Sequence, residues 1–141
     1  MMNVFLDTNI LLEVVLCRKK KAVCQQILQA GMDGEVSLFA SYLSFANMAY
    51  ILQRNKVPRE QIYQVERMLE SRMEVLPMDR SQLRAALRHE VKDFEDMLQY
   101  QSALTGGCDC IVTINTDDFT EFSSLPIYSP DDLLDLLDSE D

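Results

Sequence analysis

The sequence predicts a three-layer α/β/α domain with a mainly parallel central sheet. Short apolar segments with strand character alternate with amphipathic helical segments along the 141 residues. Strands separated by one or two helices cannot pair as hairpins, so they should pair in parallel, with helices on both faces of the sheet. With 48% hydrophobic residues the chain can build a substantial core, and we expect a single domain over residues 1–141.

The first half of the chain supplies two of the expected strands. Gly31 is the expected stop of one helix, and Ser41 is the expected N-cap of the next, whose apolar face should carry Leu43, Ala46, Tyr50 and Ile51. The expected elements are a strand at residues 4–6, helices over 9–16 and 19–30, a strand over 35–40 and a helix over 41–54.

The second half repeats the alternation. Pro58 should begin a helix, Asp79 should cap another, and Gly106 and Gly107 should end the helix that opens with "DFED". The expected elements are a helix over 58–72, a strand within 73–78, helices over 79–90 and 93–105, a strand over 110–114 and an extended segment over 125–129. Residues 129–141 should form an acidic C-terminal helix and tail, whose leucines pack on the domain.

Composition restricts the function classes. The net charge is −10, and the six acids of "DDLLDLLDSED" at the end leave −4 for the rest of the chain, a balance that disfavours a nucleic-acid partner. Only one histidine, His89, is present, in a polar helical segment, so catalysis built on a histidine base is nearly excluded. Neither a signal peptide nor a membrane-spanning stretch is recognisable, so we expect a cytoplasmic protein.

The four cysteines are expected to act as small hydrophobic residues in the core. Their spacing fits neither a zinc site nor a redox motif nor a disulfide framework. The residues are Cys17, Cys24, Cys108 and Cys110.

Acidic residues from three separate segments should meet at one edge of the sheet. Asp7 ends the first strand, Asp118 follows the strand near the other end of the chain, and Asp93 and Asp96 share one face at the start of the helix between them. Ligands of parallel α/β sheets bind beyond the carboxyl ends of the strands. Clustered carboxylates repel one another unless a cation bridges them, and oxygen ligands alone favour Mg²⁺ or Mn²⁺ over zinc.

Local roles could explain each of these acids separately. Asp7 and Asp93 could be helix N-caps, Glu95 and Asp96 could interact with the positive end of a helix, and "NTD" at 115–117 is a common turn sequence. Composition and spacing leave both interpretations open.

Four segments of the chain resemble the PIN-domain family. They are "VFLDTNILLEVVLCR", "DFEDMLQYQSAL", "IVTINTDDF" and "LPIYSPDDLL", in this order and over essentially the whole chain. The second resembles the D-F-E-D-bearing branch of VapC-like toxin ribonucleases. The resemblance implies a Rossmann-like fold, Mg²⁺ or Mn²⁺ bound by acids, cleavage of RNA, and a cognate antitoxin protein.

The resemblance assigns roles to individual residues. It makes Asp7, Asp96 and Asp118 the metal ligands, and Asp93 a catalytic ligand or general base. Arg18 matches a recurrent arginine and becomes the candidate contact to RNA. The supporting positions that it implies are Thr8, Asn9 and Asn47, together with Thr113 and Asn115, which it places with Asp118 at the rim of the site.

The chain departs from the family at three positions. The next family acid falls at or near Asn47, Asn115 stands where many members carry an acid, and Ile114 replaces an arginine that close relatives often have. An amide adds no negative charge, and Asp93 is the candidate for the missing one.

One other function stays under consideration, and a further one fails. The two amides, Ile114 and the acidic body support a PIN-like module with weak catalysis that acts mainly by binding a protein partner. A phosphatase of the haloacid dehalogenase type would need an aspartate at position 9, where Asn9 stands. PIN relatives commonly pair, so a homodimer is also expected.

Overall fold

A computed structural model describes residues 1–139, and the expected Glu140 and Asp141 of the tail lie outside the described residues. Within residues 1–139 five strands form one parallel sheet in the order β3-β2-β1-β4-β5. The strands are β1 Met2–Leu6, β2 Val36–Ser41, β3 Glu74–Leu76, β4 Cys110–Val112 and β5 Ile127–Tyr128. The predicted α/β class with a parallel central sheet is therefore confirmed.

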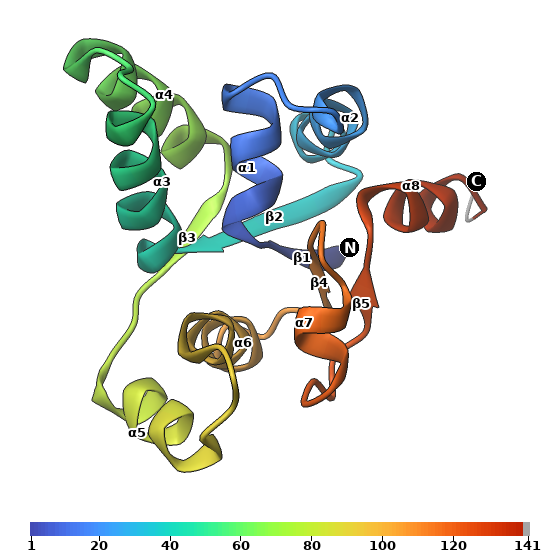
Figure 1. The fold of residues 1–141 in the computed structure, drawn as a ribbon. Coiled ribbons are helices and arrows are strands. Elements are labelled where there is room, and N and C mark those ends of the chain that lie inside the picture. The colour runs from blue at the N-terminus through green and yellow to red at the C-terminus, as the bar shows by residue number, and fades with distance from the viewer. Residues whose placement is uncertain (140–141) are drawn as a thin grey trace.

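Helices cover both faces of the sheet (Figure 1). They are α1 Thr8–Val15, α2 Lys21–Met32, α3 Tyr42–Arg54, α4 Arg59–Arg72, α5 Arg80–His89, α6 Phe94–Thr105, α7 Asp117–Thr120 and α8 Pro130–Ser139. Side chains alternate across β1: Val4 and Leu6 join the core under α1–α4 and α8, whereas Phe5 joins the core under α5–α7. Burial on both faces explains why this strand is apolar throughout.

The order of the strands reverses at β1. Val4 pairs with Leu38 of β2 on one side and with Cys110 of β4 on the other. From β1 the chain builds outward to β2 and β3, and then returns to add β4 and β5 on the other side. In open parallel sheets ligands bind outside the carboxyl ends at such a reversal. Asp7 follows β1 directly at this point, and its backbone N–H donates to the Val112 carbonyl at 3.0 Å.

Gly31 does not end the second helix, so that expectation was wrong. α2 continues to Met32, and the left-handed residue that follows it is Gly34, with φ of 77°. A Cβ at position 31 would overlap the side chain of Leu38 in β2. Gly31 therefore allows close approach of the helix to the sheet, and the reversal of the chain falls three residues later.

The predicted face of α3 was wrong in part, since Ile51 packs against the core but Ala46 and Tyr50 do not lie inside. Its buried residues are Ser44, Met48 and Leu52, whereas Ala46 is exposed and Tyr50 is 58% exposed. The apolar pattern misled because Ser44 is held in the interior by hydrogen bonds that periodicity does not reveal. The predicted cap is confirmed, since the Ser41 hydroxyl accepts the Ser44 N–H at 3.2 Å.

Three of the four cysteines are buried as expected, namely Cys24, Cys108 and Cys110. Cys17 is exposed, with a left-handed φ of 53°, because it lies where the chain turns between α1 and α2.

The short helix α7 was not predicted, since "DDFT" forms a single helical turn within a segment expected to be a turn. None of the helices within residues 1–139 has the length and apolarity needed to cross a membrane.

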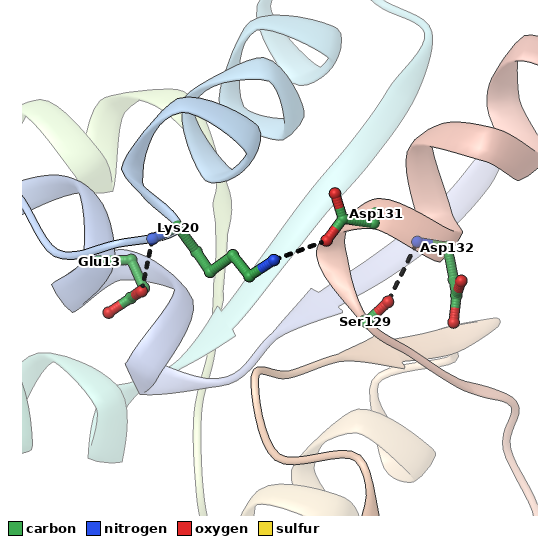
Figure 2. A network of polar contacts seen from close by, with 5 residues as sticks. All are labelled: Glu13, Lys20, Ser129, Asp131 and Asp132. Carbon is green, nitrogen blue, oxygen red and sulfur yellow. Dashed lines mark hydrogen bonds and ion pairs between the residues drawn. The ribbon is translucent and has the colours of Figure 1, made fainter.

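The acidic helix α8 docks on α2, as expected from its leucines. Leu133 is fully buried, and Leu134 and Leu137 pack against the same core. Figure 2 shows the polar contacts beside this interface, in which Lys20 Nζ lies 3.2 Å from Asp131 Oδ2. Both ends of this ion pair are more than half exposed, so it contributes less than about 1 kcal/mol and the leucines provide most of the stability of the docking.

Candidate active site

A pocket of about 540 Å³ opens at the carboxyl edge of β1, where the strand order reverses. Residues from α1, α3, α6 and α7 line it, together with the loop after α1. Of the ten residues singled out in the sequence, eight line this pocket: Asp7, Thr8, Asn9, Arg18, Asn47, Asp93, Asp96 and Asp118. The fold thus brings together four distant segments of the chain at one place.

Asp7 is held by the protein on both oxygens. Oδ1 accepts the N–H of Thr8 at 2.9 Å and Oδ2 accepts the hydroxyl of Thr113 at 2.9 Å. Asp7 is the N-cap of α1, so the capping role considered from the sequence is present in addition to its place in the pocket. Burial raises the pKa of Asp7 to about 6, against the lowering effect of these two hydrogen bonds.

Asp96 lies at the first turn of α6 and faces the same pocket. Partial burial, followed by repulsion from Asp7, Asp93, Asp118 and Glu95, raises its pKa to about 7. Repulsion of this kind requires the carboxylates to lie near one another, so the pocket holds a concentration of negative charge that no basic side chain neutralises by a salt bridge within residues 1–139.

Asp93 has a structural contact that accounts for part of its position. It is the N-cap of α6, and its Oδ1 accepts the backbone N–H of Asp96 at 3.1 Å. The cap fixes where α6 begins and therefore where Asp96 lies. Asp93 is exposed and lines the pocket, and among the described residues its second oxygen accepts no hydrogen bond.

Asn47 forms a hydrogen bond with Glu95. From the sequence, Glu95 was considered only for its interaction with the positive end of a helix. Asn47 Nδ2 donates to Oε1 of Glu95 at 2.5 Å, and both residues line the pocket. The pKa of Glu95 is raised by burial and then by Asp93. Asn47 of α3 carries no charge of its own, but its partner Glu95 of α6 places a carboxyl group at the same point of the pocket.

Thr113 and Asn115 do not line the pocket, unlike the rim position expected for them. Thr113 is fully buried beneath Asp7, and its Oγ1 also accepts Asn9 Nδ2 at 3.3 Å. Asn115 is exposed and donates its backbone N–H to the same hydroxyl at 3.4 Å. Ile114 packs against the larger core, which explains an apolar residue at that position.

Arg18 reaches the pocket from the loop that follows α1. The buried Glu13 holds this loop in place: its backbone carbonyl accepts the N–H of Arg18 at 2.9 Å, and its Oε1 accepts the N–H of Lys20 at 3.0 Å (Figure 2). A charge at position 13 is unusual inside an apolar helix, and this contact explains it.

A closed network of buried polar side chains supports the floor of the pocket. Gln99 of α6 donates to Thr8 Oγ1 at 3.1 Å and to Ser44 Oγ at 2.8 Å, and it accepts the Ser41 hydroxyl at 2.5 Å. Thr8 in turn donates to Ser44 at 2.9 Å. All four residues are buried, so the network ties α1, α3 and α6 together directly behind Asp7.

We expect Gln99→Ala to lower the free energy of unfolding by about 3 kcal/mol, because three hydrogen bonds disappear and buried hydroxyls lose partners. Gln101→Ala is the matched control: Gln101 is on the same helix, is 7% exposed, and its amide donates only to the Met97 sulfur at 3.5 Å. Urea unfolding of both variants measures the difference. Equal losses would contradict a special role for the network.

The donor chemistry of the pocket fits a hard divalent cation. Carboxylate oxygens from Asp7, Asp96 and Asp118, with Glu95 beside them, are the ligands that Mg²⁺ and Mn²⁺ prefer. The raised pKa values of Asp7 and Asp96 indicate that these two charges need compensation. Among residues 1–139, however, no three acidic, histidine or cysteine side chains stand close enough to form a ready ligand group.

Several residues of this site were not singled out in the sequence. Glu95, Leu12 and Ile51 line the pocket, and Gln99 and Ser44 support it from below. Glu95 could have been found as the third member of "DFED" on the pocket side of α6. The partners of Gln99 lie 55 and 91 residues away in the chain, which no local pattern can reveal.

Comparison with known proteins places the chain in a family. A family model described as PIN domain matches residues 3–117. No curated protein sequence matched. This match does not distinguish branches of the family, so membership of the D-F-E-D branch stays a prediction.

Three solved structures share the fold. They are VapBC2 from Rickettsia felis bound to a promoter DNA fragment (TM-score 0.69, 20% identity, 91% of this chain and 98% of that one), a toxin–antitoxin complex from Klebsiella pneumoniae (0.62, 19%, 90% and 97%) and VapBC-1 from nontypeable Haemophilus influenzae (0.67, 18%, 92% and 99%). The match of the family model over most of the sequence shows that the chain belongs to the PIN domain family.

Proposed function

We propose that this protein is a Mg²⁺- or Mn²⁺-dependent endoribonuclease that acts as the toxin of a toxin–antitoxin pair. The observation that carries the proposal is the convergence of Asp7, Asp96 and Asp118, from three segments, on one pocket at the point where the strand order reverses. The family and the toxin–antitoxin nature of the structural neighbours support it.

In this proposal Asp7, Asp96 and Asp118 hold the cation. When bound, the ion supplies Lewis-acid activation of water and neutralises charge on the scissile phosphate. It also reverses the local charge, which is how an acidic pocket can accept an anionic substrate. Asp93 and Glu95 at the rim would position water or accept a proton, and Asn47 would keep Glu95 turned into the pocket.

Arg18 is the proposed contact to an RNA phosphate. We expect Arg18→Gln to raise KM several-fold and to reduce the dependence of log KM on log salt by about one, since one phosphate contact is lost. The neighbouring Lys19→Gln serves as control, because Lys19 is exposed and does not line the pocket. Initial cleavage rates at several RNA concentrations, repeated at a series of salt concentrations, give KM and its dependence on salt. If the slope of log KM against log salt is unchanged in Arg18→Gln, Arg18 is not a phosphate contact.

The proposal is tested directly by incubating the purified protein with mixed single-stranded RNA and Mn²⁺ or Mg²⁺. Cleavage that disappears with EDTA and in Asp7→Asn supports the nuclease. Absence of cleavage by folded protein freed of any partner, together with absence of Mn²⁺ binding in calorimetry, would contradict it.

Partners are proposed on the same basis. A cognate antitoxin would bind this chain and suppress cleavage, which co-expression with the product of the adjacent reading frame and copurification would test. A homodimer is proposed as well, and sedimentation of the purified protein measures it.

A second candidate function is a PIN-like module that acts mainly by binding a protein partner. The observation in its favour is that amides stand at Asn47 and Asn115 and that the described acids form no ready ligand group. Partner binding by a variant that neither binds Mn²⁺ nor cuts RNA would favour this function over the first.

A further inference from the structure

The pocket has two walls of different chemistry. One carries the carboxylates already described. The other is built from α1 and α3 and presents Leu12, Ile51 and the aromatic ring of Tyr50. Tyr50 is 58% exposed although it lines a pocket, so its ring is available to a ligand. Apolar side chains in the same pocket as the carboxylates are not required for holding a cation.

The ring of Tyr50 is held in place by a neighbour on its own helix. The guanidinium carbon of Arg54 lies 5.7 Å from the ring centroid, and Arg54 Nη1 donates to the phenolic oxygen at 3.0 Å. The contact restricts the ring without covering its exposed face, since more than half of the residue stays accessible. A restrained, exposed aromatic ring loses little conformational freedom when a flat ligand packs on it.

We propose that Tyr50 is a stacking platform for a nucleobase of the RNA and that it positions the adjacent phosphate at the carboxylate wall. The inference rests on the proposed nuclease function and adds a subsite to it. Every nucleobase offers a flat π surface, and stacking on an aromatic side chain is the usual way in which proteins hold single-stranded RNA. The volume of about 540 Å³ is sufficient for one nucleotide with its phosphate.

A second tyrosine provides a matched control. Tyr63 of α4 is 57% exposed, and Arg67 lies 5.7 Å from its ring centroid, as in the pair of Tyr50 and Arg54. Tyr63 lines a different groove, between α3 and α4, and not the pocket of the carboxylates. The two residues therefore differ mainly in their distance from the proposed site.

The chain contains no tryptophan, which permits a direct test of stacking. We would place a single reporter with Tyr50→Trp or Tyr63→Trp, each in an Asp7→Asn background that prevents cleavage, and add single-stranded RNA in the presence of Mg²⁺. We expect saturable quenching of the tryptophan at position 50 and unchanged emission at position 63. Binding of labelled RNA is followed in parallel by anisotropy.

A kinetic test separates positioning from a merely structural role. We expect Tyr50→Leu to raise KM about tenfold and to spread cleavage over more positions. Tyr50→Phe loses the hydrogen bond from Arg54 but retains the ring on which a base would stack, so it should keep the wild-type cleavage pattern. Tyr63→Leu should behave like wild type. The midpoint of urea unfolding should be unchanged for each variant, since both tyrosines are exposed.

The outcomes distinguish this inference from the proposed function. The platform is overturned, and the nuclease stays in place, if wild type cleaves RNA while RNA does not quench the tryptophan at position 50 and Tyr50→Leu has wild-type kinetics. Quenching at position 50 without cleavage by wild type supports the platform and overturns the nuclease. RNA that neither binds in the anisotropy measurement nor is cleaved by wild type overturns both.

Discussion

Asp7→Asn is expected to abolish RNA cleavage while making the cation-free protein more stable at pH 8. Loss of a metal ligand should lower the cleavage rate by at least about 10³-fold, because several kcal/mol of transition-state stabilisation disappear. Stability should rise because the folded protein holds the buried Asp7 carboxylate with a pKa of about 6, above its ordinary value of 3.8. This rise in pKa corresponds to a loss of at most about 3 kcal/mol in the free energy of unfolding of wild type at pH 8.

The sign of this effect sets its pH dependence. A carboxyl whose pKa is raised by folding costs nothing when it is protonated, below about pH 4, and costs its full amount above about pH 6. Wild type should therefore lose stability relative to Asp7→Asn as the pH rises from 4 to 7. Urea unfolding in EDTA at pH 4.5 and pH 8 measures the two differences.

The control for Asp7→Asn is Asp117→Asn, an identical chemical change at an exposed residue that does not line the pocket. It should alter neither cleavage nor the pH dependence. If Asp7→Asn is less stable than wild type at pH 8, the hydrogen bond from Thr113 outweighs the cost of burying the charge, and the electrostatic interpretation fails.

The fold was largely predictable because its signals are local. The apolar run of β1 indicates burial on both faces, and the cap residues Ser41 and Asp79 fixed the starts of α3 and α5 within a residue. Parallel pairing followed from the lengths of the connections, since helices separate the strands. The rule that parallel sheets bind ligands at their carboxyl ends then predicted one place for Asp7 and Asp118.

What the sequence could not predict depends on which partner a side chain finds across the fold. Thr113 was expected at the rim of the site, but its hydroxyl is needed beneath Asp7 as a hydrogen-bond donor. Gly31 was expected to end a helix, yet it serves the contact with Leu38. In each case the residue type suits two roles, and only the three-dimensional neighbour decides between them.

In the site, the acids could be predicted from the sequence, whereas the polar residues that support them could not. Carboxylates at strand ends are recognisable because desolvating a charge needs a reason. The amide of Gln99 and the hydroxyl of Ser44 carry no such cost once they are paired, so nothing in their own segments marks them as part of the site. The pairing of Asn47 with Glu95 likewise joins positions 48 residues apart.

Asp96→Asn is expected to weaken Mn²⁺ binding by about 100-fold or more and to flatten its pH dependence. In the cation-free protein, burial and neighbouring acids raise the pKa of Asp96 to about 7, so near pH 6 most of it is protonated. A cation can bind only the carboxylate, and binding near pH 6 must therefore release a proton. Affinity should rise with pH up to about 7 and then level.

Calorimetry with Mn²⁺ at pH 6 and pH 8, in two buffers of different ionisation heat, counts the protons released. Wild type should release more at pH 6 than at pH 8, Asp96→Asn fewer than wild type at pH 6, and Asp117→Asn the same as wild type. Release that is equal at both pH values in wild type would mean that the acids of the pocket are already ionised without the ion. The mutual repulsion that indicates a cation site in this pocket would then be absent, and the assignment of Asp96 as a ligand would lose its physical basis.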